Sequence, residues 1–263
     1  MSDQPNPTYV VAALDKGLTL LRHLADYPNS GVSDIAARTG STKSQVFRLL
    51  YTLERQGFVH KDPVSRNYAL GHTCLFLGEH VRSRSSLVSV AEPVMARLVA
   101  ETQENVHLVV REGLNSVVLA LEESHQPVRL YAQVGREGPL HAGGSSMELL
   151  AHAPESVVDD VLAGPLTAFT DRTETRPEAV RRTLRNIRAA GHHVALGDLD
   201  EGAFSIAAPI RDHRGTVVAA LSIAGPLSRL TPSIQANHVL RVTGAAEHVS
   251  VGLGAPVPAA AVG

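Results

Sequence analysis

Cysteine is nearly absent from this 263-residue sequence, in which Cys74 is the only one. A single cysteine excludes an internal disulfide and any metal site built from several thiolates. Long apolar runs are also missing: no stretch approaches the roughly 18 to 20 residues that a membrane-spanning helix needs. The polar start, MSDQPNPT, lacks the apolar segment of a signal peptide. We therefore expect a soluble, cytoplasmic protein with no membrane partner.

Net charge is small, at -2, but the basic residues are unevenly placed. Residues 38–66 hold six Lys or Arg against two Asp or Glu. Such a local patch attracts phosphate groups, although a solvated helix face can have a similar composition. The charge pattern alone therefore leaves open whether this segment binds nucleic acid.

Apolar residues recur at the helical period through the first part of the chain. They predict a helix from about Val11 to Tyr27, a short helix capped by Ser33, and a third helix after a turn at Gly40. The inward face of the third helix consists of Val46, Leu49, Leu50 and Leu53. This spacing is that of a helix-turn-helix motif.

Two short strands, in FVHK and YALG, follow the third helix and are joined by DPVSRN. Three helices and a hairpin make a winged helix. The wing carries Lys61 and Arg66 at or near its tip, where they can reach phosphates or a minor groove. The alternative is a three-helix domain whose polar face binds another protein.

The candidate DNA-contacting residues lie at the start and on the outer face of the third helix and in the wing. They are Ser41, Thr42, Lys43, Ser44, Gln45, Arg48, Thr52, Lys61 and Arg66. Ser41 or Thr42 caps the helix, and with Thr42 as the cap Gln45 completes a capping box. Gln45 can also pair with adenine through two hydrogen bonds.

The rest of the chain alternates helix and strand patterns, and a 44% hydrophobic content suits two domains. We expect a winged helix at 1–70, a linker helix at 71–89, a sheet-and-helix domain at 90–254 and a disordered tail at 255–263. Strands are predicted in VHLVVRE, VVLALEE, VRLYAQV, AFSIAAPI and TVVAALSIAG. The fold class is α+β, with helices on the faces of an antiparallel sheet.

Catalytic motifs are incomplete. GGSS near His141 resembles part of a nucleophile elbow, but Met147 stands where the final glycine of that motif belongs. The thirteen histidines include no H-E-x-x-H, and the glycine-rich GREGPLHAGG lacks phosphate-loop spacing. We expect no enzyme activity, no cofactor and no metal site.

A binding pocket fits the same segment better. Small residues at 142–146, followed by MELLAHA, place free backbone amides at a helix N-terminus, where an anionic ligand is stabilised. The alternative is that these small residues only permit close packing.

The sequence from Gly31 to Gly71 resembles the DNA-binding domain of IclR-type bacterial transcription regulators. The resemblance rests on GVSDIAARTGSTKSQVFRLLYTLERQGFVHKDPVSRNYALG and continues through VGREGPLHAGGSSMELLA and AAPIRDHRGTVVAALSIAGP, so it covers about residues 11–253. Lys43, Ser44 and Arg48 match the family's recognition helix. Ser41 and Thr42 replace its usual Leu-Pro, and Gln45 its usual Thr, so the operator is expected to differ from those of relatives.

The resemblance implies a GAF-like effector-binding domain, dimerisation through the linker helix, and a tetramer of paired dimers. It also implies an effector cavity for small carboxylates or aromatic acids. Carried over by position, its lining is Leu140, His141, Ala142, Gly143, Gly144, Ser145, Ser205, Ser222 and Ala224. The family's acidic pair before the strand is replaced by ALGD, with Asp198 displaced. We interpret this as a loss of acidic groups, which favours a larger, less charged guest.

Three functions remain open at this point. The first is a ligand-responsive regulator, a repressor of a catabolic operon, whose partners are a palindromic double-stranded DNA operator, a small-molecule effector and further copies of the chain. The others are a protein-protein adaptor using the winged helix and a hydrolase with a DNA-binding appendage. The regulator agrees with helix spacing, wing and local charge together.

Overall fold

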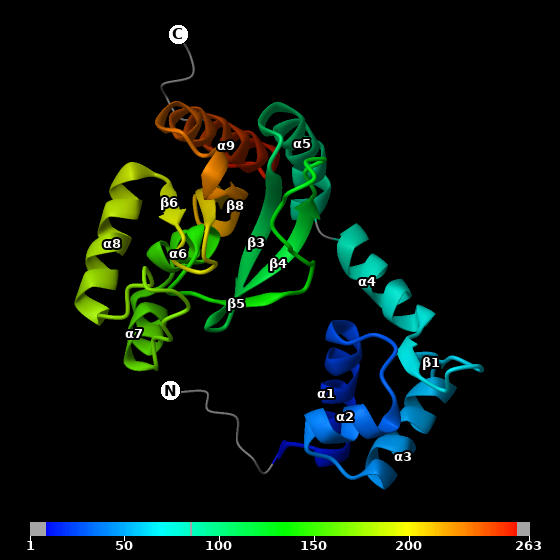
Figure 1. The fold of residues 1–263 in the computed structure, drawn as a ribbon. Helices are drawn as coiled ribbons and strands as arrows, with labels where there is room; N and C mark the ends of the chain where they lie inside the picture. Colours follow the sequence, from blue (N-terminus) through cyan, green and yellow to red (C-terminus); the bar gives the residue numbers. More distant parts are fainter. Residues whose placement is uncertain (1–8, 85, 257–263) are drawn as a thin grey trace. The chain divides into compact units, whose positions relative to one another are not determined.

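The chain divides at residue 84 into two compact units in the computed structural model, which describes residues 9–84 and 86–256 (Figure 1). At residue 79 and residues 81–84 it describes the backbone alone. The tail predicted to be disordered lies outside the described residues from 257 onward. Among the described helices, none combines the length and apolar composition that a membrane crossing requires.

The first unit is the predicted winged helix. It comprises α1 (Ala12–Asp26), α2 (Val32–Thr39), α3 (Lys43–Arg55), the antiparallel strands β1 (Val59–Lys61) and β2 (Tyr68–Leu70), and α4 (His72–Arg84). Its core joins one face of each of α1, α2 and α3 to the hairpin and contains Leu20, Leu24, Ile35, Ala36, Val46, Leu50, Val59 and Tyr68. Gly40 ends α2 in the left-handed conformation, at φ 64°, which glycine adopts without strain.

The start of α2 differs from the prediction. The helix begins at Val32 after an extended Gly31, and no side chain caps it, so Ser33 lies inside the first turn. Just before it, Tyr68 donates its backbone N–H to Ser30 O at 3.0 Å. This contact with β2 fixes where the chain enters the helix, and local capping preference does not.

The predicted linker helix, residues 71–89, corresponds to α4 and the first residues of α5 (Ser86–Thr102). α4 ends at Arg84, so the last residues of the predicted linker belong to α5. Cys74, which is half-buried, donates its thiol to Phe58 O at 3.5 Å, whereas Leu75 and Leu77 are exposed. The side chain of Val81, another apolar residue of the predicted linker helix, lies outside the described part of the chain.

A six-stranded antiparallel sheet organises the second unit, with the strand order β5-β4-β3-β8-β7-β6. The strands are β3 (Asn105–Glu112), β4 (Asn115–Glu122), β5 (Glu137–Pro139), β6 (His193–Leu196), β7 (Ala203–Arg211) and β8 (Val217–Pro226). A short 3-10 helix (Leu227–Arg229) follows β8.

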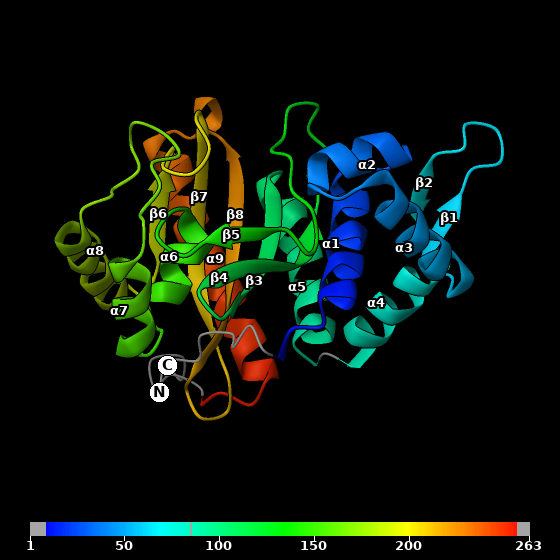
Figure 2. The ribbon, with the colours of Figure 1, turned by 90° about the horizontal axis from the view of Figure 1, so that it is seen from below.

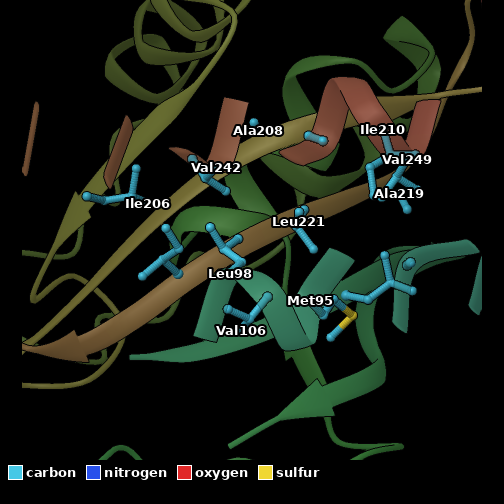
Figure 3. Close-up of a cluster of buried hydrophobic side chains, with 14 of the residues drawn as sticks. Met95, Leu98, Val106, Ile206, Ala208, Ile210, Ala219, Leu221, Val242 and Val249 are labelled. Carbon is cyan, nitrogen blue, oxygen red and sulfur yellow. The ribbon is translucent and has the colours of Figure 1, made fainter. Parts of the chain in front are cut away.

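Helices cover both faces of this sheet (Figures 1 and 2). α5 and α9 (Pro232–Gly252) pack on one face, where Met95 and Leu98 of α5 meet Val106, Ile206 and Leu221 of the strands (Figure 3). α6 (Gly144–Ala151) packs on the other face, with α8 (Pro177–Ala190) against it and α7 (Glu155–Ala163) beside it. Side chains that alternate along each strand therefore serve two different layers.

The strand predicted in VRLYAQV does not form. Residues 128–134 are irregular, and the edge strand that pairs with β4 is β5. Two carbonyls of the segment accept from side chains instead: Leu130 O from Asn105 Nδ2 at 2.9 Å and Val128 O from Arg229 Nη1 at 2.8 Å. These side chains satisfy backbone groups that a strand would satisfy through its ladder.

Candidate DNA-contacting surface and effector cavity

The start of α3 is held by the predicted capping box. Thr42 Oγ1 accepts from Gln45 N at 3.2 Å, and Gln45 Oε1 accepts from Thr42 N at 3.3 Å. Because the amide oxygen of Gln45 is engaged here, pairing with adenine through two hydrogen bonds requires this side chain to leave the box. In this conformation Gln45 organises the helix start.

The outer face of α3 carries the other predicted contacts. Lys43, Ser44 and Arg48 are exposed, while Ser41 is half-buried before the helix. The Thr52 hydroxyl donates to Arg48 O at 3.0 Å, so towards an outside partner it can only accept a hydrogen bond. Val46 and Leu50 on the opposite side are fully buried, so packing against α1 and α2 fixes the direction of the outer face.

Two aromatic residues on α3 were not in the predicted contact set. Tyr51 is 57% exposed and Phe47 is 52% exposed. At the helical period Tyr51 lies between Arg48 and Arg55, three residues from one and four from the other. The sequence indicates that Tyr51 is exposed, because it lies outside the i, i+3, i+4, i+7 pattern of the buried positions.

The wing is organised by Asp62. Its carboxylate accepts from Val64 N at 3.0 Å, from Ser65 N at 2.6 Å and from the Ser65 hydroxyl at 2.9 Å. These bonds, led by those from Ser65, lower the pKa of Asp62. Arg66 follows in the left-handed region, at φ 64°, and is exposed. Lys61 Nζ lies 5.4 Å from the centre of the Tyr68 ring, so both predicted wing cations stand on an ordered hairpin.

A cavity of about 270 Å³ lies on the face of the sheet that α6 covers. Of the residues predicted to line it, five do: Gly143, Gly144, Ser145, Ser205 and Ala224. They come from the start of α6 and from the neighbouring strands β7 and β8. The fold therefore brings together residues that are about 80 positions apart in the sequence.

The other four predicted lining residues are near the cavity but do not line it. Leu140 and Ala142 are buried, Leu140 within the packing between α6 and α8. His141 Nε2 pairs with Thr167 O at 2.9 Å, and its ring packs against Phe169, which does line the cavity. Ser222 is fully buried and accepts a hydrogen bond from Ser145 Oγ at 2.8 Å. The side chain of Ser145 therefore lies between Ser222 and the cavity.

The first turn of α6 contributes backbone amides to the cavity wall. The N-cap Gly143 has a φ of 87° and donates its own N–H to Asp198 Oδ2 at 2.9 Å. The amides of Gly144, Ser145 and Ser146 open the helix, and helix geometry gives them no intrahelical acceptor. A group with negative charge is favoured beside such amides.

The cavity retains acidic groups, contrary to the interpretation from the sequence. Asp198 and Asp200 line it beyond β6, and Glu137 lines it at β5. The displaced Asp198 is still placed at the wall because the turn after β6 folds back to meet Gly143. The expected loss of acidic groups is therefore wrong, and the inference of a less charged guest loses that support.

The lining residues absent from the prediction include His107 on β3 and Arg136 before β5. Burial, and secondarily the charge of Arg136, lowers the pKa of His107 to about 4, so its imidazole is neutral near pH 7. The alternation of VHLVV contains a signal for His107, because it puts this residue on the face opposite Val106 and Leu108. Arg136 carries no such signal, since it stands in an irregular segment.

Two family profiles match the chain. The profile of the IclR helix-turn-helix domain matches residues 13–63, and that of the C-terminal domain of the bacterial transcriptional regulator IclR matches residues 79–251. Among curated proteins, the transcriptional repressor AllR of Klebsiella pneumoniae is 32% identical over 255 residues, covering 95% of this chain and 93% of its own. The regulator KipR of Bacillus subtilis is 32% identical over 82% of this chain and 86% of its own.

Solved structures agree with these matches. An IclR transcriptional regulator from Alicyclobacillus acidocaldarius superposes with a TM-score of 0.84 at 28% identity, covering 94% of this chain and all of its own. An IclR homolog from Microbacterium hydrocarbonoxydans, solved in complex with 4-hydroxybenzoate, has a TM-score of 0.80 at 30% identity, covering 92% of this chain and 98% of its own. Domain matches, relatives and fold all indicate transcriptional regulators and not enzymes. The chain belongs to the IclR family of bacterial transcriptional regulators.

Proposed function

We propose that this regulator binds a palindromic operator through α3 and the wing, represses a catabolic operon, and changes its operator affinity when a small organic or aromatic acid enters the cavity. The observation that carries the proposal is the cavity beside the first turn of α6, in the same chain as an exposed recognition helix. A regulator that senses a small molecule needs both elements.

An acid is the class of effector that the cavity favours. Its wall combines the opening amides of α6, the Arg136 guanidinium and the apolar surfaces of Val109, Val118 and Phe169. About 270 Å³ is small for a ligand site and suits a guest with a single ring or a short chain. The 4-hydroxybenzoate bound by the Microbacterium homolog is a guest of that size and charge.

A homo-oligomer is part of the same proposal. One helix-turn-helix reads only a few base pairs, so a specific site requires two copies about one helical turn apart. Exposed apolar side chains support self-association: Leu14 and Leu18 are exposed on α1 and Val11 just before it, and Leu75, Phe76 and Leu77 are exposed on α4. Exposure of so many apolar residues is unfavourable in an isolated chain.

Arg48 provides the test of operator reading. The full-length protein is titrated, by fluorescence anisotropy, onto duplexes from the DNA upstream of its own gene and onto a scrambled duplex. Arg48→Ala is expected to weaken binding to the specific duplex by about 1–3 kcal/mol with little change for the scrambled one. Arg172→Ala, which removes an exposed cation from the second unit, is the matched control. Equal specific binding by Arg48→Ala and the parent would refute the assignment of α3.

Effector binding is tested on the same protein by calorimetry with benzoate and the three monohydroxybenzoates. Binding of any of them, together with a change of operator affinity when it is added, supports the proposal. A coupling free energy of about 1–3 kcal/mol would be ordinary for two linked sites. An acid that binds without changing operator affinity would contradict the regulatory part.

A further inference from the structure

We infer that His107 selects the effector by binding an uncharged hydroxyl group, while Arg136 binds the acid group of the same molecule. This inference rests on the proposed function, because it assigns roles within the effector cavity. It concerns two residues that none of the resemblances identified.

His107 is positioned by the middle of the sheet. It lies on β3 opposite Ser222 of β8, with the buried Val106 and Leu108 fixing the strand on the other face. Its side chain lines the cavity, yet Nε2 is shielded from solvent and has no hydrogen-bond partner among the described residues. A buried polar atom left unpaired is unfavourable, so a guest that pairs with this ring removes that penalty on binding.

A half-turn of the ring about the Cβ–Cγ bond exchanges its nitrogen and carbon positions without changing its shape. The imidazole can therefore present a nitrogen to the cavity at little steric cost. Which nitrogen carries the proton is not fixed by a partner. A hydroxyl group both donates and accepts, so it pairs with either tautomer.

The charges around the cavity decide the orientation of the guest. Arg136 stands just before β5, at one edge of the sheet, whereas Asp198 and Asp200 follow β6 at the opposite edge. Glu137 is also at the β5 edge, where Asn115 Nδ2 donates to its Oε2 at 3.2 Å. Within the described residues no hydrogen bond or ion pair is recorded for the guanidinium of Arg136. An acid group is attracted to the Arg136 edge and repelled from the β6 edge.

The lowered pKa of His107 agrees with separate sites for the acid group and the hydroxyl group of the guest. Burial, and secondarily the charge of Arg136, opposes protonation of the ring, so His107 stays neutral and the positive charge remains with Arg136. The acid group of the guest pairs with the permanent cation, and the hydroxyl group pairs with the uncharged ring. This arrangement rejects an acid that lacks a hydroxyl, because the His107 nitrogen would stay buried and unpaired.

The test compares benzoate with 2-, 3- and 4-hydroxybenzoate on the full-length protein, by calorimetry, in the parent, His107→Phe, His107→Gln and Arg136→Gln. The measured quantity is the ratio of affinities for the best hydroxybenzoate and benzoate. In the parent this ratio is expected to be about tenfold, the value of one hydrogen bond. His107→Phe keeps a ring without nitrogen and should bring the ratio near one, whereas His107→Gln keeps a hydrogen-bonding group and should restore part of it.

Arg136→Gln is expected to weaken all four acids by a similar factor and to leave the ratio unchanged. A ratio in both His107 variants equal to that of the parent would overturn the role of His107 while leaving the effector cavity intact. If the parent bound none of the four acids, the proposed effector class would fail and this inference with it. A change in ratio cannot come from a general loss of folding, which would lower all affinities together.

Discussion

Ser145 donates its hydroxyl to Ser222 Oγ across 2.8 Å and thereby ties the first turn of α6 to the central strand β8. Both side chains are buried, and Ser145 also lines the cavity. The pair supports the cavity wall from behind, so its two members are expected to respond differently from residues that touch the effector.

Ser222→Ala should lower the free energy of unfolding by about 1–3 kcal/mol, because the buried Ser145 hydroxyl loses its acceptor. Effector affinity should change little. Urea unfolding and calorimetry on the same preparation check both expectations. Ser145→Ala with Ser222→Ala should cost less than the sum of the single changes, since neither partner is then left unpaired. Unchanged stability together with lost effector binding would instead place Ser222 in contact with the guest.

Gly144 is expected to tolerate no side chain. A Cβ there would lie 2.4 Å from Ser205 Oγ and 2.8 Å from Ser205 O, and the backbone atom cannot move aside cheaply. Gly144→Ala should therefore destabilise the second unit by about 1–3 kcal/mol through overpacking. Thermal unfolding measures this loss. A variant that fills the cavity without that strain is Ala132→Phe, because Ala132 lies in the irregular segment at the cavity wall. It should prevent the binding of acids while the free energy of unfolding stays close to that of the parent. Equal stability of Gly144→Ala and the parent would contradict the close approach.

Arg66 in the wing should contribute to all duplexes alike. Arg66→Asn removes the charge and keeps a residue that accepts the left-handed backbone at φ 64°. Operator and scrambled DNA should both bind more weakly, and the slope of log K against log salt should become shallower by about one phosphate contact. Anisotropy titrations over a range of salt concentrations check this. A loss confined to the operator would show that Arg66 reads bases.

The stability of the second unit should decrease in mild acid. Burial lowers the pKa of His107 and of His193 to about 4 from the ordinary value of 6.5. Between these values the unfolded chain takes up protons that the folded histidines refuse, so the free energy of unfolding falls as the pH decreases from 6.5 towards 4. The charges of Asp198 and His192 also act on the pKa of His193, and the charge of Arg136 acts on the pKa of His107. The lowered pKa values already contain these effects, which are smaller than that of burial.

Buried Glu148 acts in the opposite sense, because its pKa is raised above the ordinary 4.5 and its protonated folded form is favoured as the pH falls. Urea unfolding of the parent and His107→Gln at about pH 7 and about pH 5 separates the contributions, since each histidine gives at most about 1.4 kcal/mol per pH unit. The variant should lose less stability in acid. Identical losses would mean that His107 is not buried and neutral.

The sequence predicts best where one local pattern decides the structure. Val46 and Leu50 are buried as their spacing indicates, and the capping box of Thr42 and Gln45 forms as predicted. The strand predicted at residues 128–134 fails because its carbonyls are satisfied by Asn105 and Arg229, which are distant in the sequence.

The lining of the cavity was predicted only in part, because some of its residues reach the wall through contacts that are distant in the sequence. The small residues at the start of α6 indicate a binding site locally. Arg136 reaches the wall only because β5 pairs with β4, and Asp198 only because the turn after β6 meets Gly143. No spacing rule contains these long-range contacts, whereas the position of His107 follows from the alternation along β3.

Strand β3 carries two separate kinds of information on its alternating residues. Val106 and Leu108 belong to the core shared with α5 and α9, while His107 and Val109 line the cavity. A substitution at Val106 or Leu108 endangers folding, whereas one at His107 changes what the cavity accepts. Val109 contributes to both, because it also packs in the core between the sheet and α6. A mutation in the codon for His107 can therefore alter what the cavity accepts, while the codons on either side of it remain under selection for the fold.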